Sequence, residues 1–396
     1  MMDRNVVISG VGMIPFVKPG TSQSYQEMGA EASMFALKDA GIDYSLIQQV
    51  YAGYVFGDST CGQAAVYRLG MSGIPVINVN NNCSTGSTAL FLARQAVESG
   101  VAECVLALGF EQMVPGALGA IYDDRPNPLE RFLESADEID GKSEVPVALR
   151  LFGGAGLEHQ LKYGTSNETF AKVSQKARLH AKHNPRAIFR NEVTVEEVLA
   201  SPKMHGVLTR LQCCPPTCGA AAAIVVSENF ARKKNLNALI RIRAQAMTTD
   251  TSSSFEGKSM MQVVGSDMSR EAARQVFEVS GVDTGEVDVV ELHDCFTANE
   301  IITYEALGLT GEGEAEKFVS DGDNTYGGRY VVNPSGGLLS KGHPLGATGL
   351  GQCAELVWQL RGQAGQRQVE GARLGLQHNL GLGGACVVTL YEQTGS

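Results

Sequence analysis

The sequence predicts an α/β protein made of two similar halves, each with a mostly parallel sheet. Two observations support this fold class. Residues 30–56 overlay on residues 270–296 without a gap, at a shift of 240, and such self-similarity indicates a repeated structural unit. Both copies have a helical spacing of apolar residues, a glycine stop, a short turn and a strand. Strands that alternate with helices favour parallel sheets, so the two halves should form one pseudo-symmetric body.

The repeat extends beyond this overlay with small gaps. Residues 77–83 resemble residues 331–337, and the helices that follow Cys83 and His343 correspond to each other. The strand at 103–110 parallels the segment 373–391. The identical pairs of the overlay are Glu31 and Glu271, Ala32 and Ala272, Gly41 and Gly281, Asp43 and Asp283, Val50 and Val290, and Phe56 and Phe296.

A longer, more polar segment at 120–208 interrupts the first half and is rich in charges and turns. After it, residues 219–230 are typical of a buried strand followed by a surface helix, and we expect that strand to rejoin the first sheet. The expected division is therefore a first half at 1–119 plus 209–235, an inserted loop domain at 120–208 and a second half at 236–396.

Composition narrows the class of protein. A net charge of −11 argues against a nucleic-acid-binding face, and no run approaches the ~18 to 20 apolar residues of a membrane span. The nine cysteines are scattered, so we expect them to be reduced and the protein to be cytoplasmic. Cys213, Cys214 and Cys218 lack a zinc-site spacing, and we interpret them as buried small residues with no metal.

Cys83 lies in a polar turn between a short β-rich run and a helix, in INVNNNCSTGSTAL. A cysteine at a helix N-terminus feels the positive end of the helix dipole, which lowers its pKa, and it lies beside free backbone N–H groups. We therefore predict a thiol nucleophile next to an oxyanion hole. The alternative is an inert buried residue, which the polar neighbours disfavour.

His343 occupies an equivalent place in the second half, in SKGHPLGATG, and is the predicted base for the Cys83 proton. The alternative is a histidine that caps its own loop. In VVELHDCF an apolar strand stops at His293, Asp294 and Cys295, and such strand ends face the ligand in α/β folds. His293 is a candidate oxyanion donor and Cys295 a second acid/base, whereas Asp294 should support structure; a structural role for His293 and Cys295 also remains open.

Two further segments are candidate binding elements. The glycine-rich stretch HNLGLGGAC (378–386) could complete an oxyanion hole with its amides, and His378 is equally a ligand or a core residue. The stretch 171–190 carries six basic residues and no acid, which suits the phosphates of a nucleotide-like cofactor or, alternatively, a solvated helix face.

These motifs resemble the thiolase superfamily over the whole chain. NNNCSTGSTAL is similar to the nucleophile motif and GHPLGATG to the Gly-His-Pro motif. HDCF stands where most thiolases have Asn-Glu-Ala-Phe, as in thiolases of the sterol-carrier-protein-2 type. The segments GYVFGDSTCGQ, GDNTYGG, VNPSGG and QHNLGLGG match the same subgroup.

The resemblance implies two βαβαβαββ halves in a five-layered α-β-α-β-α fold with an inserted loop domain. It implies a homodimer or homotetramer and coenzyme A thioesters as substrates, with no covalently bound cofactor. It assigns Cys83 as the acyl-accepting nucleophile, His343 as its activator, and His293 with His343 as the groups that hold the thioester oxygen. The amides of Cys83 and Gly383 would bind the tetrahedral oxyanion, and Arg178, Lys182 and Arg186 are the candidate CoA-binding residues.

One departure from ordinary thiolases affects the mechanism. They carry an acid/base cysteine in a Cys-x-Gly motif near the C-terminus, where this chain has Asn379-Leu380-Gly381. Cys295 is expected to replace it and to protonate the enolate that leaves when Cys83 cleaves a 3-oxoacyl-CoA. Three alternatives remain: a decarboxylating condensing enzyme, a partner-dependent retro-aldolase of steroid side-chain CoA esters, and a CoA-binding scaffold without activity.

Overall fold

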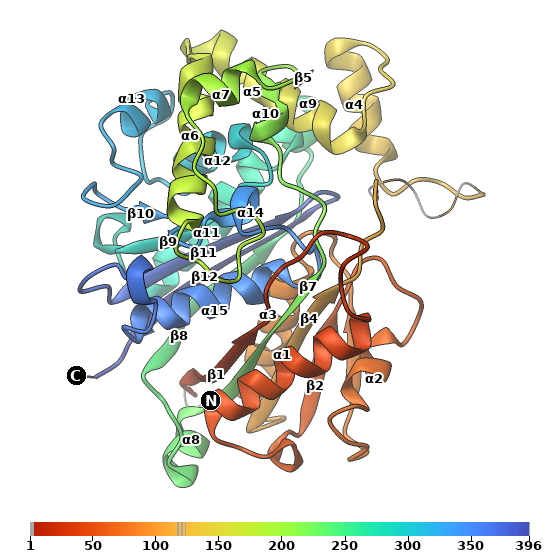
Figure 1. The fold of residues 1–396 in the computed structure, drawn as a ribbon, viewed down its shortest axis with the longest axis vertical. Coiled ribbons are helices and arrows are strands. Elements are labelled where there is room, and N and C mark those ends of the chain that lie inside the picture. Colours follow the sequence, from red (N-terminus) through yellow and green to blue (C-terminus); the bar gives the residue numbers. More distant parts are fainter. Residues whose placement is uncertain (1–3, 117–118, 120–121, 123, 396) are drawn as a thin grey trace.

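The two halves of the chain fold with the same strand order. The computed structural model describes residues 4–116, 119, 122 and 124–395; the expected start of the insertion at 119–120 adjoins residues outside this range. The strands run β10-β9-β11-β12-β8-β1-β7-β4-β2-β3 (Figure 1). The order β3-β2-β4-β7-β1 in the first half therefore equals β10-β9-β11-β12-β8 in the second.

The first-half strands are β1 Val6–Met13, β2 Gln49–Gly53, β3 Val76–Val79, β4 Cys104–Glu111 and β7 Gly219–Ser227. The second-half strands are β8 Ile240–Thr248, β9 Val289–Glu291, β10 Val331–Val332, β11 Leu374–Gly381 and β12 Ala385–Gln393. The helices outside the insertion are α1 Tyr25–Ala40, α2 Cys61–Val66, α3 Thr85–Glu98, α8 Glu228–Lys234, α9 Ser253–Glu256, α10 Met260–Val263, α11 Ser266–Ser280, α12 Thr297–Ala306, α13 Ala315–Ser320, α14 Gly337–Ser340 and α15 Thr348–Leu360. The insertion holds α4 Glu130–Asp140, α5 Val147–Tyr163, α6 Asn167–Ala181, α7 Val195–Ala200 and the two-stranded β5 Lys203–His205 and β6 Leu208–Thr209.

The structure confirms the predicted repeat, because the residues that cap the corresponding helices and turns are the same in the two halves. Helices α1 and α11 both end at a glycine, Gly41 and Gly281, with φ of 69° at each. This left-handed conformation is accessible to glycine at little cost. The next 3₁₀ turn begins in both copies with an aspartate, Asp43 or Asp283, whose carboxylate accepts a hydrogen bond from the backbone N–H two residues on. The identical glycines thus end the corresponding helices, and the identical aspartates begin the corresponding turns.

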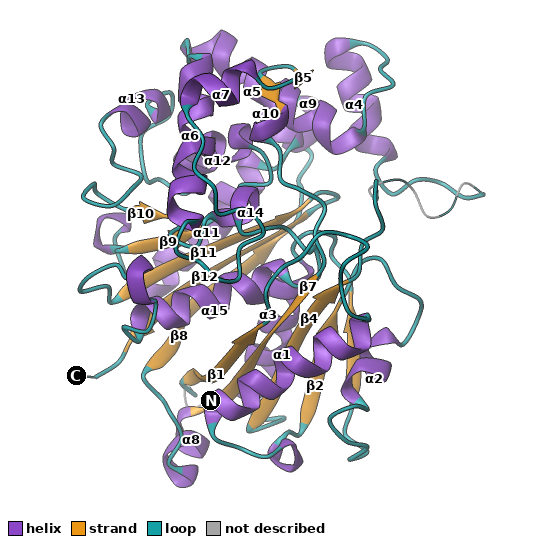
Figure 2. Cartoon of the chain, viewed as in Figure 1, coloured by secondary structure: helices purple, strands orange, loops and turns teal. Residues whose placement is uncertain are grey.

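The halves stack in five layers, as the resemblance implies (Figure 2). The expectation of mostly parallel sheets is wrong, because β7 and β12 each pair antiparallel with both of their neighbours. Helices α3 and α15 pack against each other between the two sheets. Helix α1 covers the outer face of β1 and β7, and α11 covers the outer face of β8 and β12. The sheets join edge to edge where β1 meets β8 through Val7–Arg241 and Ile8–Ile240. An apolar core on each side of each sheet follows from strands that are buried on both faces.

The insertion begins and ends in the first half of the chain, but its helices pack against the second half. Strand β7 returns between β4 and β1, which confirms the expected rejoining. Helices α5 and α6 pack on α12, and α6 also packs on α14 (Figure 1, green-yellow helices above the sheets). The ring of Phe152 stacks on Phe296 at 5.2 Å between centroids. The insertion therefore covers the segment that contains His293 and Cys295, a placement that composition alone does not predict.

None of the nine cysteines, all within the described ranges, forms a disulfide. Among the described helices, none combines the length and the apolar character needed to cross a membrane.

Candidate active site

Cys83 lies in the turn between β3 and α3. Asn82, just before it, has φ of 50°, in the left-handed region, so the chain turns sharply at this point. The hydroxyl of Thr85 accepts from the Asn81 amide at 2.8 Å, and the hydroxyl of Ser84 donates to the Asn81 carbonyl at 2.9 Å. These side chains close the turn itself and do not cap the helix in the usual way, so Cys83 is held rigidly at the start of α3.

The structure brings Cys83, His293 and His343 together from three separate segments. The sulfur of Cys83 and one ring nitrogen of each histidine lie within 4.8 Å of one another. The two imidazole rings meet edge to face, with centroids 5.0 Å apart and an interplanar angle of 85°. Both histidines are buried, whereas Cys83 keeps partial exposure. A thiol with two neighbouring imidazoles is an arrangement suited to nucleophilic catalysis.

The hydrogen bond and the burial of His343 keep its ring able to act as a base. Its Nδ1 lies 2.7 Å from the hydroxyl of Thr348, which itself donates to the Pro344 carbonyl at 3.0 Å. Because that hydroxyl proton is already used, Nδ1 carries the ring proton and donates it to Thr348. Nε2 is then a free lone pair, and it is buried without a hydrogen-bond partner among the described residues. Burial lowers the pKa of His343 to about 3, so the ring is neutral and able to accept a proton.

Burial affects the pKa of the Cys83 thiol more than the N-terminus of helix α3 does. Burial, followed by the nearby carboxylate of Glu111, raises the pKa of Cys83 to about 12. The backbone amides of Cys83 and Leu382 lower this pKa, but by less. The expectation of a lowered pKa is therefore wrong for the free protein, because desolvation of the thiolate outweighs the helix N-terminus. The resting nucleophile is a thiol that must lose its proton as it reacts.

Cys295 lies between β9 and α12, is buried, and carries a protonated thiol. Burial, and then the charges of Cys214, Cys83 and Asp294, raise its pKa well above the ordinary value. The Cys295 carbonyl accepts a hydrogen bond of 2.9 Å from the Cys214 amide, which ties the two backbone segments together. At neutral pH this thiol is protonated, so it has a proton to give to a strongly basic carbon such as that of an enolate.

Asp294 supports structure, as expected. Its carboxylate accepts from the Leu338 amide at 2.7 Å and from the Leu339 amide at 3.3 Å, at the start of α14. His378 is a core residue: its Nε2 lies 2.9 Å from the Ser269 hydroxyl, and its Nδ1 accepts from the His293 amide at 3.4 Å. Both residues therefore position the segments that carry His293 and His343.

The turn after β11 provides amides near the nucleophile. The Leu382 amide donates toward the Cys83 sulfur, and the Leu382 carbonyl accepts from the Asn82 side chain at 2.9 Å. Gly383, the next residue, has φ of 101°, which only glycine adopts readily. The amide of this turn that donates toward the sulfur thus belongs to Leu382, the neighbour of Gly383, and the role of Gly383 itself stays a prediction.

Three residues of the site were missed in the sequence. Cys214, which its spacing predicts to be a buried small residue, lies close to both thiols: the charge of Cys83 raises the pKa of Cys214, and the charge of Cys214 raises the pKa of Cys295. Glu111 accepts from the Val55, Phe56 and Gly346 amides at 2.9 to 3.1 Å. Asn379 contacts both Cys83 and His293. The only available signal was at Asn379, which replaces the cysteine of the Cys-x-Gly motif.

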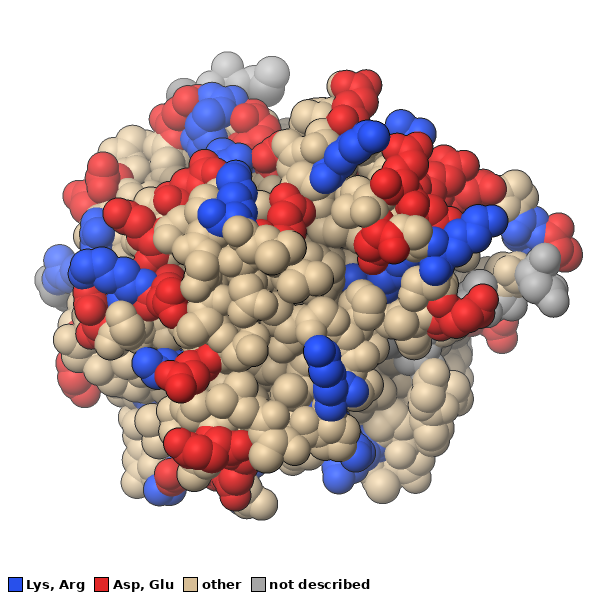
Figure 3. All heavy atoms as spheres, turned by 90° about the horizontal axis from the view of Figure 1, so that it is seen from above, with Lys and Arg blue, Asp and Glu red and all other residues tan. Residues whose placement is uncertain are grey.

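The predicted CoA-binding residues all make contacts within the protein. The guanidinium of Arg178 lies over the Phe189 ring at 4.3 Å, and that of Arg186 lies over the Trp358 ring at 4.1 Å. Lys182 pairs with Glu192 at 2.6 Å. On the face in Figure 3, blue basic and red acidic side chains mix around an uncharged centre. Binding of CoA by these three basic residues stays a prediction.

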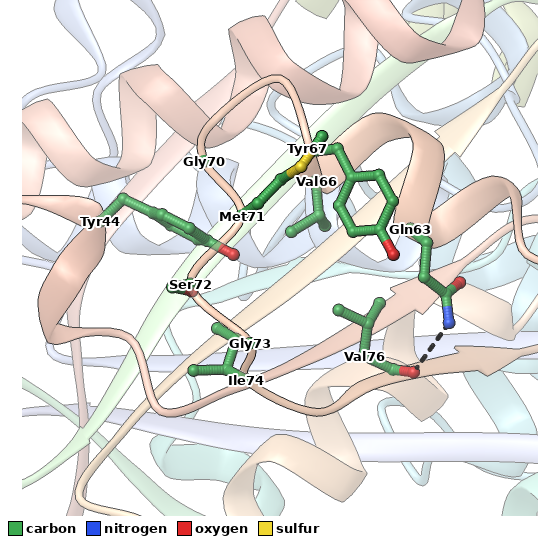
Figure 4. A pocket seen from close by; sticks show the side chains of 10 residues that line it. All are labelled: Tyr44, Gln63, Val66, Tyr67, Gly70, Met71, Ser72, Gly73, Ile74 and Val76. Carbon is green, nitrogen blue, oxygen red and sulfur yellow. Dashed lines mark hydrogen bonds between the residues drawn. The ribbon is translucent and has the colours of Figure 1, made fainter.

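A surface cavity of about 440 Å³ lies away from these side chains (Figure 4). Residues from α2 through the following segment to the first residue of β3 line it, together with Tyr44. In Figure 4 the Gln63 side chain donates to the Val76 carbonyl, at 3.3 Å. None of the predicted site residues lines this cavity, so it is not the place of the chemistry.

Comparisons with known proteins agree with this geometry. The family model of the thiolase N-terminal domain matches residues 6–229, and the model described as thiolase C-terminal domain-like matches residues 250–391. The chain belongs to the thiolase family. Its sequence is 58% identical over 391 residues to sterol carrier protein 2 of Oryctolagus cuniculus, covering 98% of this chain and 72% of the relative. This thiolase is therefore of the sterol-carrier-protein-2 type.

More distant relatives support the enzyme class and the fold. An acetyl-CoA acetyltransferase of Methanothermobacter thermautotrophicus is 34% identical over 397 residues, covering 98% of this chain and 100% of the relative. The solved Ltp2-ChsH2(DUF35) aldolase is similar in fold, with a TM-score of 0.83, 22% identity and 98% coverage of each chain. Human mitochondrial 3-ketoacyl-CoA thiolase in complex with CoA gives a TM-score of 0.73, with 19% identity, 99% coverage of this chain and 98% of that one. The thiolase described here is an acyltransferase.

Proposed function

We propose that this thiolase cleaves a 3-oxoacyl-CoA with free CoA through an acyl intermediate on Cys83, in fatty-acid or sterol side-chain β-oxidation. One observation carries the proposal: a thiol, two neutral imidazoles and a second protonated thiol meet at one place. Cys83, His293 and His343 have their reactive atoms within 4.8 Å of one another. Cys295 lies close enough that the charge of Cys83 raises its pKa.

In the first half-reaction, the Cys83 proton passes to Nε2 of His343 while the sulfur attacks the 3-keto carbon. The amides of Cys83 and of the turn after β11 stabilise the resulting oxyanion. Because the resting pKa of Cys83 is about 12, proton transfer and attack are coupled, and no stable thiolate precedes them. A thiol suits this step since it also leaves readily from the later thioester.

In the next step, the C2–C3 bond breaks and the acyl group stays on Cys83. The electron pair of that bond becomes an enolate of acetyl-CoA or propionyl-CoA, whose thioester oxygen His293 and His343 hold. The thiol of Cys295 then gives its proton to C2. A second CoA returns a proton to the Cys295 sulfur, attacks the acyl group on Cys83, and the released sulfur regains its proton from His343.

The remaining expectations are part of the same proposal. Arg178, Lys182 and Arg186 are proposed to bind the phosphates of CoA, and the protein is proposed to be cytoplasmic. A homodimer or homotetramer is proposed because β3 lies at the end of the strand order with half-buried side chains. An edge strand of this kind can pair with another chain. Light scattering after gel filtration measures the mass in solution, and a monomer would contradict this part.

Thiolysis of a panel of straight-chain, 2-methyl-branched and steroid side-chain 3-oxoacyl-CoAs tests the function. Wild type is compared with Cys83→Ala, which removes the nucleophile, and with Cys295→Ala, which removes the proposed proton donor. Turnover should vanish in Cys83→Ala. Cys295→Ala should still become acylated at Cys83 by acyl-CoA, as mass spectrometry of the intact protein detects, but should lose cleavage. Full cleavage by Cys295→Ala would contradict the role of Cys295 as the proton donor, and a wild type that is acylated at Cys83 but cleaves no panel member would favour a condensing enzyme.

A further inference from the structure

The side chain of Asn379 is fully buried where the two halves meet. Its Nδ2 donates to the Cys83 carbonyl at 3.1 Å and lies 3.0 Å from Nδ1 of His293. Its Oδ1 accepts from the Ser87 hydroxyl at 2.8 Å. One amide group therefore contacts the backbone of the nucleophile, the ring of His293 and the middle helix α3.

The direction of each of these hydrogen bonds is determined by a main-chain carbonyl. The Cys83 carbonyl can only accept, so the nitrogen of Asn379 must face it. The Ser87 hydroxyl must then donate to Oδ1, and it accepts from Nε2 of Gln377 at 2.8 Å. That nitrogen also donates to the Gly349 carbonyl at 2.6 Å, which determines the orientation of Gln377. The Tyr391 hydroxyl donates to Oε1 of Gln377 at 2.5 Å and completes the chain.

This chain has one consequence for His293. Since Nδ2 of Asn379 is a donor, Nδ1 of His293 must be an acceptor and carry no proton. Burial, and then the charges of His343 and His378, lower the pKa of His293 well below its ordinary value, so the ring holds a single proton. That proton must lie on Nε2. His343 has the opposite tautomer, with its proton on Nδ1 toward Thr348.

We propose that Asn379 is a positioning residue that fixes His293 as an Nε2–H donor toward the reacting thioester. This inference rests on the proposed function for the identity of the acceptor, but the tautomer itself does not. A developing negative oxygen needs a donor that is already oriented, and loss of one such donor typically costs about 10²–10³-fold in kcat. With the other tautomer, Nε2 would present a lone pair to that oxygen.

The contacts of Asn379 explain why an asparagine suits position 379, where ordinary thiolases have the cysteine of the Cys-x-Gly motif. A thiol in place of Asn379 could not hold Cys83 and His293 at once, because it has a single weak donor. Once Cys295 supplies the second acidic thiol, residue 379 is free to serve as an amide. The change from Cys-x-Gly to Asn-Leu-Gly therefore accompanies the presence of histidine at 293, whose tautomer needs a fixed donor.

The test compares wild type with Asn379→Asp and Ser87→Ala by ¹⁵N NMR of the free protein labelled at histidine, with His293→Gln to assign the signal. We expect Nε2–H in wild type. In Asn379→Asp the carboxylate only accepts, so His293 should move its proton to Nδ1 or become charged. Ser87→Ala keeps both Nδ2 hydrogen bonds and should retain the wild-type His293 signal.

Kinetics provide the second readout. Asn379→Asp should lose about 10²-fold or more in kcat for thiolysis, with KM little changed and with alkylation of Cys83 by iodoacetamide retained. An Nδ1–H tautomer in wild type, or an Nε2–H tautomer with full kcat in Asn379→Asp, would overturn the inference. If wild type shows Nε2–H but cleaves no 3-oxoacyl-CoA, the proposed function fails while the positioning stands. If Asn379→Asp does not fold, an Nδ1–H tautomer of His293 in the wild type still overturns the inference.

Discussion

Gly381, at the end of β11, packs directly against the turn that carries the nucleophile. A Cβ atom at this position would lie 2.2 Å from the Asn81 carbonyl oxygen and 2.7 Å from the Ser84 hydroxyl. Ordinary contacts of a Cβ atom begin near 3.4 Å. Gly381→Ala therefore forces the turn at 81–84 away from β11 by about 1 Å, since its obstacle is backbone and cannot rotate aside.

The expected loss can be stated from this displacement. Overpacking of a closed core typically costs about 1–3 kcal/mol of folding free energy, which a protein of this size can tolerate and still fold. A shift of about 1 Å in reacting groups can cost about 10²-fold in rate. Because the turn at 81–84 carries Cys83 and the residue directly after β11 carries the Leu382 amide, the change separates the nucleophile from its oxyanion donor.

Gly375→Ala is the matched control in the same strand. Its Cβ would meet the side-chain ends of Leu356 and Leu360 at 3.2 and 3.5 Å, which can adjust. Thiolysis kcat should fall about 10²-fold in Gly381→Ala and stay within a few-fold of wild type in Gly375→Ala, with thermal melting to confirm that both fold. A Gly381→Ala variant with more than half of wild-type kcat would refute the packing argument.

Three further outcomes follow from the site. Alkylation of Cys83 by iodoacetamide should speed up about tenfold per pH unit from pH 7 to 10, because its pKa is about 12; a plateau below pH 7 would instead indicate a stable thiolate. Thr348→Val leaves the Nδ1–H of His343 unpaired, so kcat for thiolysis should fall about 10- to 100-fold, and an unchanged kcat would contradict the assigned tautomer. Glu111 has its pKa raised by burial from 4.5 to about 7, so the folded state binds the extra proton and stability should decrease as pH rises through that window. Urea unfolding at pH 5 and pH 8 should show a smaller decrease for Glu111→Gln than for wild type.

Much of the fold could be predicted from the sequence because the repeat is local and carried by identical residues. Gly41 and Gly281 end their helices in the same conformation, and Asp43 and Asp283 begin the same turn. The covering of the second half by the insertion could not be predicted in this way. It depends on side-chain packing between segments such as Phe152 and Phe296, for which no periodic pattern exists.

Some features of the candidate site could also be predicted from the sequence, and others could not. Cys83, His293 and His343 could be found because each stands at an abrupt change from an apolar run to a polar turn. The pKa of Cys83 could not be predicted, since the helix N-terminus is visible in the sequence whereas desolvation and the carboxylate of Glu111 arise only from packing. In the sequence, Asn379 stands out only as a position without the cysteine of ordinary thiolases, because its three partners lie in distant segments.

The contacts of Asn379, Gly381 and Leu382 with the turn around Cys83 link two segments that are about 300 residues apart in sequence. Each of these contacts crosses from the second half to the first. A substitution in residues 377–382 is therefore tolerated only together with a compatible turn at 81–88. Among related sequences, the two segments should covary as one unit, because the surroundings of the nucleophile are determined partly by a strand of the other half of the chain.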